Sequence, residues 1–100
     1  MAARIPIVNG VSVAEATVEV RNRLGLHLRA ATALAETVNR FKSTVTLTRG
    51  KNQVNARSVT GLMILGAGIG TKLKVRAEGD DAREAVAAVK QLFEARFGED

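Results

Sequence analysis

The sequence predicts one α+β domain, a two-layer open-faced sandwich in the order βαββαβα, with a four-stranded, mainly antiparallel sheet and helices on one face. Short segments that alternate apolar and polar residues are typical of half-buried strands, and two longer segments repeat apolar residues at helical spacing. Glycine, asparagine and aspartate separate these segments as turn residues. A chain of 100 residues, 46% of them hydrophobic, has room for one modest core.

The elements follow from these patterns in chain order. Residues 1–15 carry Pro6 and Asn9 without a sustained period, so we expect a flexible N-terminal extension before a domain over residues 16–100. Asp81 and Ser58 are expected to cap the helices that follow them. We expect strands over residues 17–22, 44–48, 53–56 and 72–78, and helices from residue 28 to about 41, over 59–65 and from 81 to 97.

Composition excludes several classes of protein. The chain has no cysteine, which rules out a disulfide framework and thiolate metal sites, and no sequence feature suggests another metal or a cofactor. It has no secretory signal and no apolar run long enough to span a membrane, so we expect a cytoplasmic protein. The net charge of +5 raises the possibility of nucleic-acid binding, but the only aromatic residues are three phenylalanines, which we expect in or beside helices rather than on a base-stacking sheet.

His27 is the only histidine, and it stands where an extended segment ends and a helix begins. A histidine with an unperturbed side chain has a pKa of about 6.5, so its neutral ring is a nucleophile near physiological pH. The first amides of the helix and Arg29 would attract an anion. A second interpretation is a helix-capping or partly buried histidine without chemistry.

Two motifs of the chain run from Gly25 to Ala31 and from Asn55 to Gly66. They resemble motifs of HPr, the histidine-containing phosphocarrier family of the bacterial sugar phosphotransferase system. Gly25-Leu-His-Leu-Arg-Ala-Ala31 is similar to the Gly-Leu-His-Ala-Arg-Pro-Ala signature of the family. Asn55-Ala-Arg-Ser-Val-Thr-Gly-Leu-Met-Ile-Leu-Gly66 is similar to the segment around its regulatory serine. The resemblance covers about residues 16 to 97, and the family fold agrees with the predicted order of elements.

The resemblance implies a phosphoryl carrier rather than an independent turnover enzyme. His27 would accept a phosphoryl group from phosphorylated enzyme I and pass it to a histidine of an enzyme II A domain, with Arg29 stabilising the phosphate. The family uses Nδ1, although the sequence does not show which nitrogen is used here. We expect a monomer whose partners contact Leu28, Thr32, Val59, Thr60, Gly61, Met63 and Ile64.

Four alternatives stay open. Ser58 is either a plain N-cap or the target of an HPr kinase/phosphorylase, whose phosphate would disturb the docking of enzyme I. Leu28 and Ala30 replace a family alanine and a family proline, and Leu28 points toward a nitrogen-type or other regulatory branch. The chain could also be a regulatory module of the same fold that is not phosphorylated, or a small basic RNA-binding domain.

Overall fold

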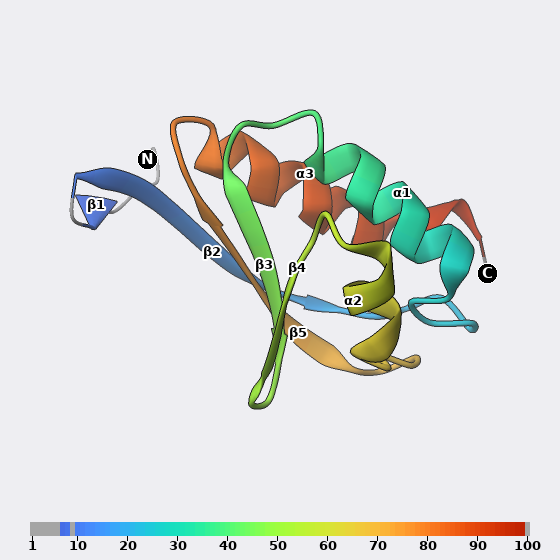
Figure 1. Cartoon of the computed structure of the whole chain (residues 1–100). Helices are drawn as coiled ribbons and strands as arrows, with labels where there is room; N and C mark the ends of the chain where they lie inside the picture. The colour runs from blue at the N-terminus through green and yellow to red at the C-terminus, as the bar shows by residue number, and fades with distance from the viewer. Residues whose placement is uncertain (1–6, 9, 100) are drawn as a thin grey trace.

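A computed structural model of the chain describes residues 7–8 and 10–99 (Figure 1). Four strands carry the sheet and a two-residue strand extends it at one end. The predicted α+β sandwich is confirmed. The elements are β1 (Ile7–Val8), β2 (Val11–Glu19), α1 (Leu28–Val38), β3 (Thr44–Arg49), β4 (Asn52–Asn55), α2 (Val59–Ile64), β5 (Lys72–Glu78), α3 (Ala82–Glu94) and the 3₁₀ turn η1 (Arg96–Gly98).

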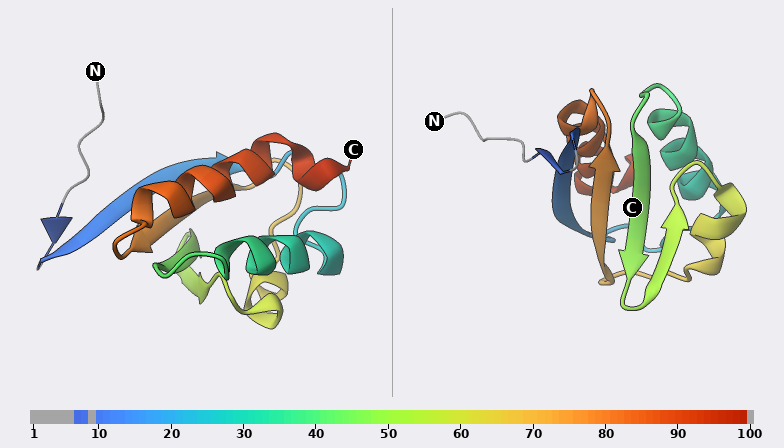
Figure 2. Two further views of the ribbon diagram at one scale, coloured as in Figure 1. Left: turned by 90° about the horizontal axis from the view of Figure 1, so that it is seen from above. Right: turned by 60° about the vertical axis from the view of Figure 1, so that its left-hand side comes forward.

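The sheet has the order β1-β2-β5-β3-β4, and every neighbouring pair is antiparallel. The central strand β5 pairs with β2 from Val13↔Glu78 to Glu19↔Lys72 and with β3 on its other side. The helices α1 and α3 lie side by side on one face, and α2 contacts α1 and β4 (Figures 1 and 2). Val20, directly after β2, exchanges backbone hydrogen bonds with Thr71 and Gly70, directly before β5, at 2.9 and 2.7 Å. These bonds hold the end of β2 and the start of β5 together where the chain enters the loop before α1.

The first long strand begins earlier than the sequence pattern predicted. Residues 11–15, assigned to a flexible extension, belong to β2, where Val13 is buried and Ala14 packs against the core. The pattern missed them because Ala14 and Ala16 are small residues with weak strand propensity, whereas pairing with β5 overrides that local preference. Residues 1–6 and 9 of the expected extension lie outside the described residues.

Both long helices end before the predicted residues. The helix α1 stops at Val38 rather than near Phe41, and α3 stops at Glu94 rather than at Phe97. Arg96 and Phe97 adopt φ values of +56° and +54°, which are left-handed and cannot continue an α-helix. The apolar spacing continued through Phe97 because this ring still packs on the core, with its centroid 4.9 Å from that of Phe93.

The core lies between the helix-covered face of the sheet and the apolar faces of α1 and α3 (Figure 2). Alternate strand residues point into it, so the predicted period of two is confirmed in β3 and β5. Fully buried aliphatic side chains and one ring form its centre: Val20, Leu34, Val38, Val45, Leu47, Leu62, Leu73, Val75, Val89 and Phe93.

Asp81 occupies the N-cap position of α3 but does not cap that helix with its side chain, contrary to our expectation. Its carboxylate instead accepts hydrogen bonds from the backbone N–H groups of Lys42 and Ser43, both at 2.9 Å, and from the Ser43 hydroxyl. These bonds hold the pKa of Asp81 below its ordinary value, with the Ser43 hydroxyl as the main cause. The carboxylate therefore ties the turn before β3 to the start of α3.

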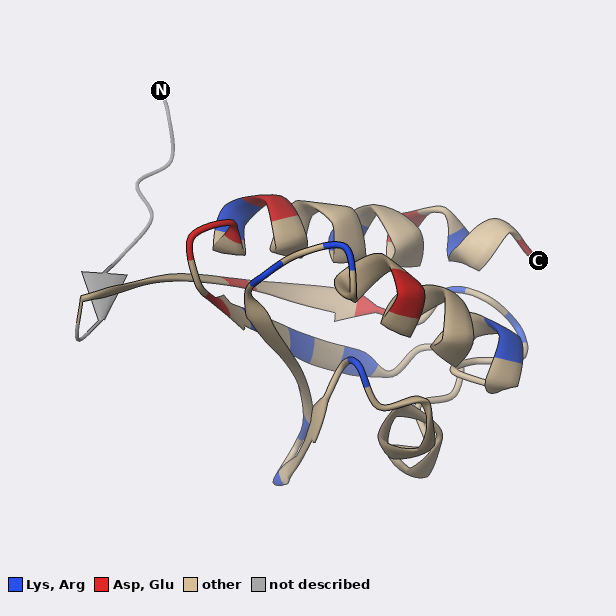
Figure 3. Ribbon diagram, turned by 45° about the horizontal axis from the view of Figure 1, so that its top comes forward, with Lys and Arg blue, Asp and Glu red and all other residues tan. Residues whose placement is uncertain are grey.

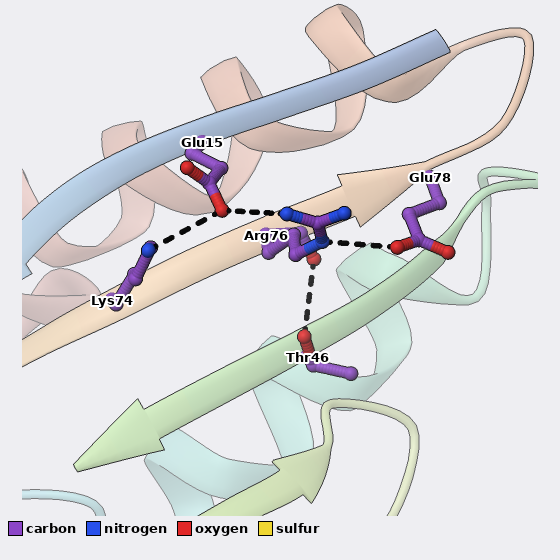
Figure 4. Close-up of polar contacts among 5 residues, drawn as sticks. All are labelled: Glu15, Thr46, Lys74, Arg76 and Glu78. Carbon is purple, nitrogen blue, oxygen red and sulfur yellow. Dashed lines mark hydrogen bonds and ion pairs between the residues drawn. The ribbon is translucent and has the colours of Figure 1, made fainter. Parts of the chain in front are cut away.

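The other face of the sheet is open to solvent and charged (Figure 4). Glu15 accepts a hydrogen bond from Arg76 at 2.9 Å and pairs with Lys74 at 3.4 Å, while Arg76 also donates to Glu78. Such exposed pairs are worth roughly 0–1 kcal/mol each. The three phenylalanines, which are the only aromatic residues of the chain, pack against or within the core instead. The open face therefore has no platform for stacking bases, which weakens the RNA-binding alternative.

No helix in the described part of the chain has the length and apolar character needed to cross a membrane.

Candidate functional site

His27 is the N-cap residue of α1, as the sequence predicted. Its backbone is extended, with φ −75° and ψ −179°, and its carbonyl accepts the first helical hydrogen bond from Ala31 at 2.8 Å. Its side chain does not cap the helix. Among the described residues, the amides of Leu28, Arg29 and Ala30 have no acceptor, so the positive end of α1 offers several donors to an incoming anion.

The loop before α1 has a backbone shape that requires glycine. Gly25 has φ +68°, and a β-carbon at this position would lie 2.5 Å from the carbonyl oxygen of Ala67. The next residue, Leu26, donates its N–H to that same carbonyl at 3.0 Å and is buried. The loop after α2 thus holds the loop before α1 by close backbone contact, and this contact sets where His27 begins the helix.

The imidazole of His27 contacts a carboxylate at the far end of the chain. Its Nε2 lies 2.8 Å from Oε1 and 3.0 Å from Oε2 of Glu99, and the two side chains are 28% and 15% exposed. The pKa of Glu99 is lowered, first by its hydrogen bond with Asn22 and then by that with His27. Because an ionised carboxylate only accepts hydrogen bonds, a neutral His27 ring in this contact would carry its hydrogen on Nε2 and its lone pair on Nδ1.

Asn22 holds the Glu99 carboxylate by a hydrogen bond. It is fully buried, and its Nδ2 donates to Glu99 Oε1 and to the carbonyl of Gly25, both at 2.8 Å. Because both partners are acceptors, the orientation of the amide is determined. Its Oδ1 is buried without a hydrogen-bond partner among the described residues, and an unsatisfied buried acceptor costs about 1–3 kcal/mol. Asn22 is therefore not explained by its contribution to stability alone.

A left-handed turn brings Glu99 to this position. Arg96, Phe97 and Gly98 have φ values of +56°, +54° and +73°, and each of the two residues with side chains is strained by about 1–2 kcal/mol. The edge-to-face contact between Phe97 and Phe93 holds the turn against the core. Tertiary packing therefore places the end of the described chain over the entrance of α1.

The site is a hollow of about 660 Å³ lined by Arg23, Leu24, His27, Leu28, Arg29 and Glu99. Arginines lie on the loop before α1 and on its first turn (Figure 3). Leu24 and Leu28 border the hollow with 71% and 60% of their surface exposed. An open basic hollow with an apolar rim suits an anionic group carried by a protein partner better than an enclosed small molecule. No group of three potential metal ligands occurs in the described chain.

The second motif, which includes Ser58 and α2, contributes no residue to the lining of the hollow. The Ser58 hydroxyl accepts a hydrogen bond from the Gly61 amide at 3.0 Å, which confirms the predicted N-cap of α2. Met63 and Ile64, which we expected partners to contact, are 44% and 77% exposed. The remaining predicted contact residues are partly buried (Thr32, Val59 and Gly61) or exposed (Thr60), on two helices that touch one another.

The sequence predicted roles for His27, Leu28 and Arg29, which the structure places around one hollow. The sequence predicted no role for Asn22, Arg23, Leu24 or Glu99. Asn22, Arg23 and Leu24 directly precede the motif that begins at Gly25. The basic and apolar character of Arg23 and Leu24 was the only feature of the sequence that could have indicated the place of this segment at the site. Glu99 lies 72 residues from His27 and depends on a turn that no local pattern predicts. Only the folded structure identifies its contact.

Comparisons with known proteins agree on one family. The profile described as "PTS HPr component phosphorylation site" matches residues 14–95. The phosphocarrier protein HPr of Xylella fastidiosa is 46% identical over 81 residues, covering 81% of this chain and 91% of that protein. The phosphocarrier protein NPr of Shewanella violacea is 39% identical over 85% of this chain and 93% of that protein. The crystal structure of HPr-C-His from Thermoanaerobacter tengcongensis superposes with a TM-score of 0.84 and 40% identity, covering 87% and 98% of the two chains.

Proposed function

Because this chain belongs to the HPr family of phosphocarrier proteins of the phosphotransferase system, we propose that His27 accepts a phosphoryl group from phosphorylated enzyme I and delivers it to a histidine of an enzyme II A domain. The observation that carries this proposal is the histidine at the uncapped entrance of α1, with its ring held by a carboxylate and basic side chains around it. In the transfer step, a ring nitrogen forms a bond to phosphorus while the bond from phosphorus to the donor breaks.

The geometry favours Nδ1 as the phosphorylated atom. Nε2 is occupied by Glu99, whereas Nδ1 has no hydrogen-bond partner among the described residues. The α1 amides and the guanidinium of Arg29 supply hydrogen bonds and positive charge for the phosphate oxygens. Ala30 adds one amide where the family has proline, so the replacement noted in the sequence enlarges this donor set.

Partners are expected to dock on the exposed apolar side chains beside the site. Leu28 is 60% exposed and borders the hollow, and Met63 and Ile64 extend this surface on α2. Leu28 is larger than the family alanine, so it changes the shape that enzyme I and the enzyme II A domain must fit. We expect transfer by a monomer, which sedimentation of the purified protein can check.

Ser58 has a second role in this proposal, as a site for an HPr kinase/phosphorylase. Its hydroxyl is on an exposed residue next to the docking surface, which supports access by a kinase. A phosphate would add about two negative charges at the start of α2 beside apolar docking residues. Incubation with kinase and ATP, followed by intact mass of wild type and Ser58→Ala, tests it. A phosphate that forms only in wild type supports regulation, and no phosphate in wild type contradicts it.

The phosphocarrier role is tested with enzyme I and phosphoenolpyruvate, followed by intact mass before and after mild acid. We expect a gain of one phosphate that acid removes, and no gain in His27→Ala with unchanged circular dichroism. A second incubation with an enzyme II A domain should return the carrier to its original mass. Wild-type protein that gains no phosphate would favour the non-phosphorylated regulatory module. A gain of phosphate that persists in His27→Ala would contradict His27 as the acceptor.

A further inference from the structure

We propose that Glu99 is a positioning residue that fixes the tautomer and orientation of the His27 ring. This inference deepens the proposed function and rests on it for its role in transfer. The ring and the carboxylate meet at 2.8 and 3.0 Å, so both carboxylate oxygens lie within reach of Nε2. A contact of this kind selects the form with hydrogen on Nε2, in the way that a buried carboxylate orients the histidine of a catalytic triad.

The carboxylate is itself held from two sides. Asn22 donates to Oε1 from a fully buried position, and the left-handed turn anchored by Phe97 sets the backbone of Glu99. Strained backbone and an incompletely bonded buried amide persist where surrounding structure over-determines them, and they cluster at functional sites. The strained backbone occurs at Arg96 and Phe97, and the incompletely bonded amide is that of Asn22; these residues place the Glu99 carboxylate against the His27 ring.

The chemistry of transfer gives this contact a use. When the lone pair of Nδ1 forms its bond to phosphorus, Nε2 keeps its hydrogen and the ring gains positive charge. The Glu99 carboxylate lies against the edge of the ring that carries this hydrogen and stabilises the developing charge without taking the proton. Arg23 and Arg29 are the other charged groups that line the hollow, and they offset the repulsion between the carboxylate and the phosphate.

The tautomer can be measured directly, because His27 is the only histidine of the chain. Two-bond ¹H–¹⁵N correlation spectra of untagged protein are recorded at a pH where the ring is neutral. In wild type we expect Nε2 to appear protonated and Nδ1 unprotonated. In Glu99→Ala and Glu99→Asp both nitrogens should shift toward intermediate values, because alanine has no acceptor and aspartate keeps the charge but is one methylene too short.

Glu94→Ala is the matched control. It removes the same charge from an exposed position at the end of α3, without touching the site. Its ring spectrum should match that of wild type. A hydrogen on Nδ1 in wild type would overturn the proposal, and so would identical ring spectra for wild type and Glu99→Ala.

The initial rate of phosphate uptake from enzyme I supplies the second measurement. We expect it to fall about tenfold in Glu99→Ala and Glu99→Asp, a size typical of residues that orient a functional histidine, and to stay unchanged in Glu94→Ala. Slow uptake in Glu99→Ala with normal uptake in Glu99→Asp would assign the effect to charge and overturn the proposal. The tautomer is read in unphosphorylated protein, so a failure of phosphate uptake in wild type would remove the proposed function without deciding the tautomer.

Discussion

The helices α1 and α2 contact one another, but their first turns are arranged in opposite ways. Ser58 turns its hydroxyl back to the Gly61 amide and closes the entrance of α2. His27 has a similarly extended backbone, yet its side chain turns to Glu99 and leaves the first amides of α1 without an acceptor in the described chain. The first turn of α2 is capped by the Ser58 side chain, whereas the first amides of α1 are available to a ligand.

Packing explains why only one of them needs a cap. The helix α1 has 11 residues and buries a full face, including Ala31, Leu34 and Val38, so tertiary contacts stabilise it. The helix α2 has six residues and buries only Leu62 among them. A short helix with so little burial depends more on local hydrogen bonds at its ends. The start of α1 can therefore lack a side-chain cap, because tertiary packing stabilises this helix.

The largest expected effect comes from breaking the loop that presents His27. Gly25→Ala should lower the free energy of unfolding by about 2–4 kcal/mol, because it adds a left-handed residue and a β-carbon 2.5 Å from the Ala67 oxygen. Gly50→Ala is the control, with φ +59° and no atom within 4 Å of an added β-carbon, so it should cost about 1–2 kcal/mol. Equal losses in urea unfolding would contradict the close contact between the two loops.

The next effect concerns the charge at the open entrance. Arg29→Ala should slow phosphate uptake roughly 10- to 100-fold, since hydrogen bonds to charged groups are worth about 1.5–3 kcal/mol. Arg83→Ala is matched, because Arg83 is likewise the second residue of a helix, α3, and is exposed. Its uptake rate should equal that of wild type. A similar slowing in both variants would show that the overall positive charge, rather than Arg29, supports uptake.

The two entrances also differ in how far the sequence could predict them. The serine cap and the histidine position were predicted, because N-caps and helix starts depend on neighbouring residues. The strand and helix periods predicted the sandwich because each element buries one face. The contact of Glu99 with His27 could not be predicted, since it depends on left-handed residues at Arg96 and Phe97 that tertiary packing imposes. Asp81 shows the same limit, because its carboxylate bonds to a distant turn instead of its own helix.

A smaller effect is expected at the closed entrance. Ser58→Ala should lower the free energy of unfolding by about 1 kcal/mol, because the Gly61 amide loses its acceptor. Thr60→Ala changes an exposed hydroxyl in the same helix and should alter stability by less than about 0.5 kcal/mol. Thermal unfolding followed by circular dichroism measures both. Unchanged stability of Ser58→Ala would mean that the cap does not support α2, and the contrast with α1 would then lose its energetic basis.

The start of α3 extends the comparison to a third case, in which the N-cap carboxylate supports another part of the fold. The pKa of Asp81 lies below its ordinary value of 3.8, chiefly through the Ser43 hydroxyl. A carboxyl group whose pKa is lower in the folded state stabilises the protein above its unfolded pKa and loses this contribution as the pH falls through the folded value. Asp81→Asn should therefore be less stable than wild type at pH 6, and the difference should shrink below about pH 4.

Urea unfolding at pH 6 and at pH 3 measures this difference in stability, with exposed Asp80→Asn as the control. A difference between Asp81→Asn and wild type that stays constant over this range would show that the bonds to Ser43 do not depend on the carboxylate charge.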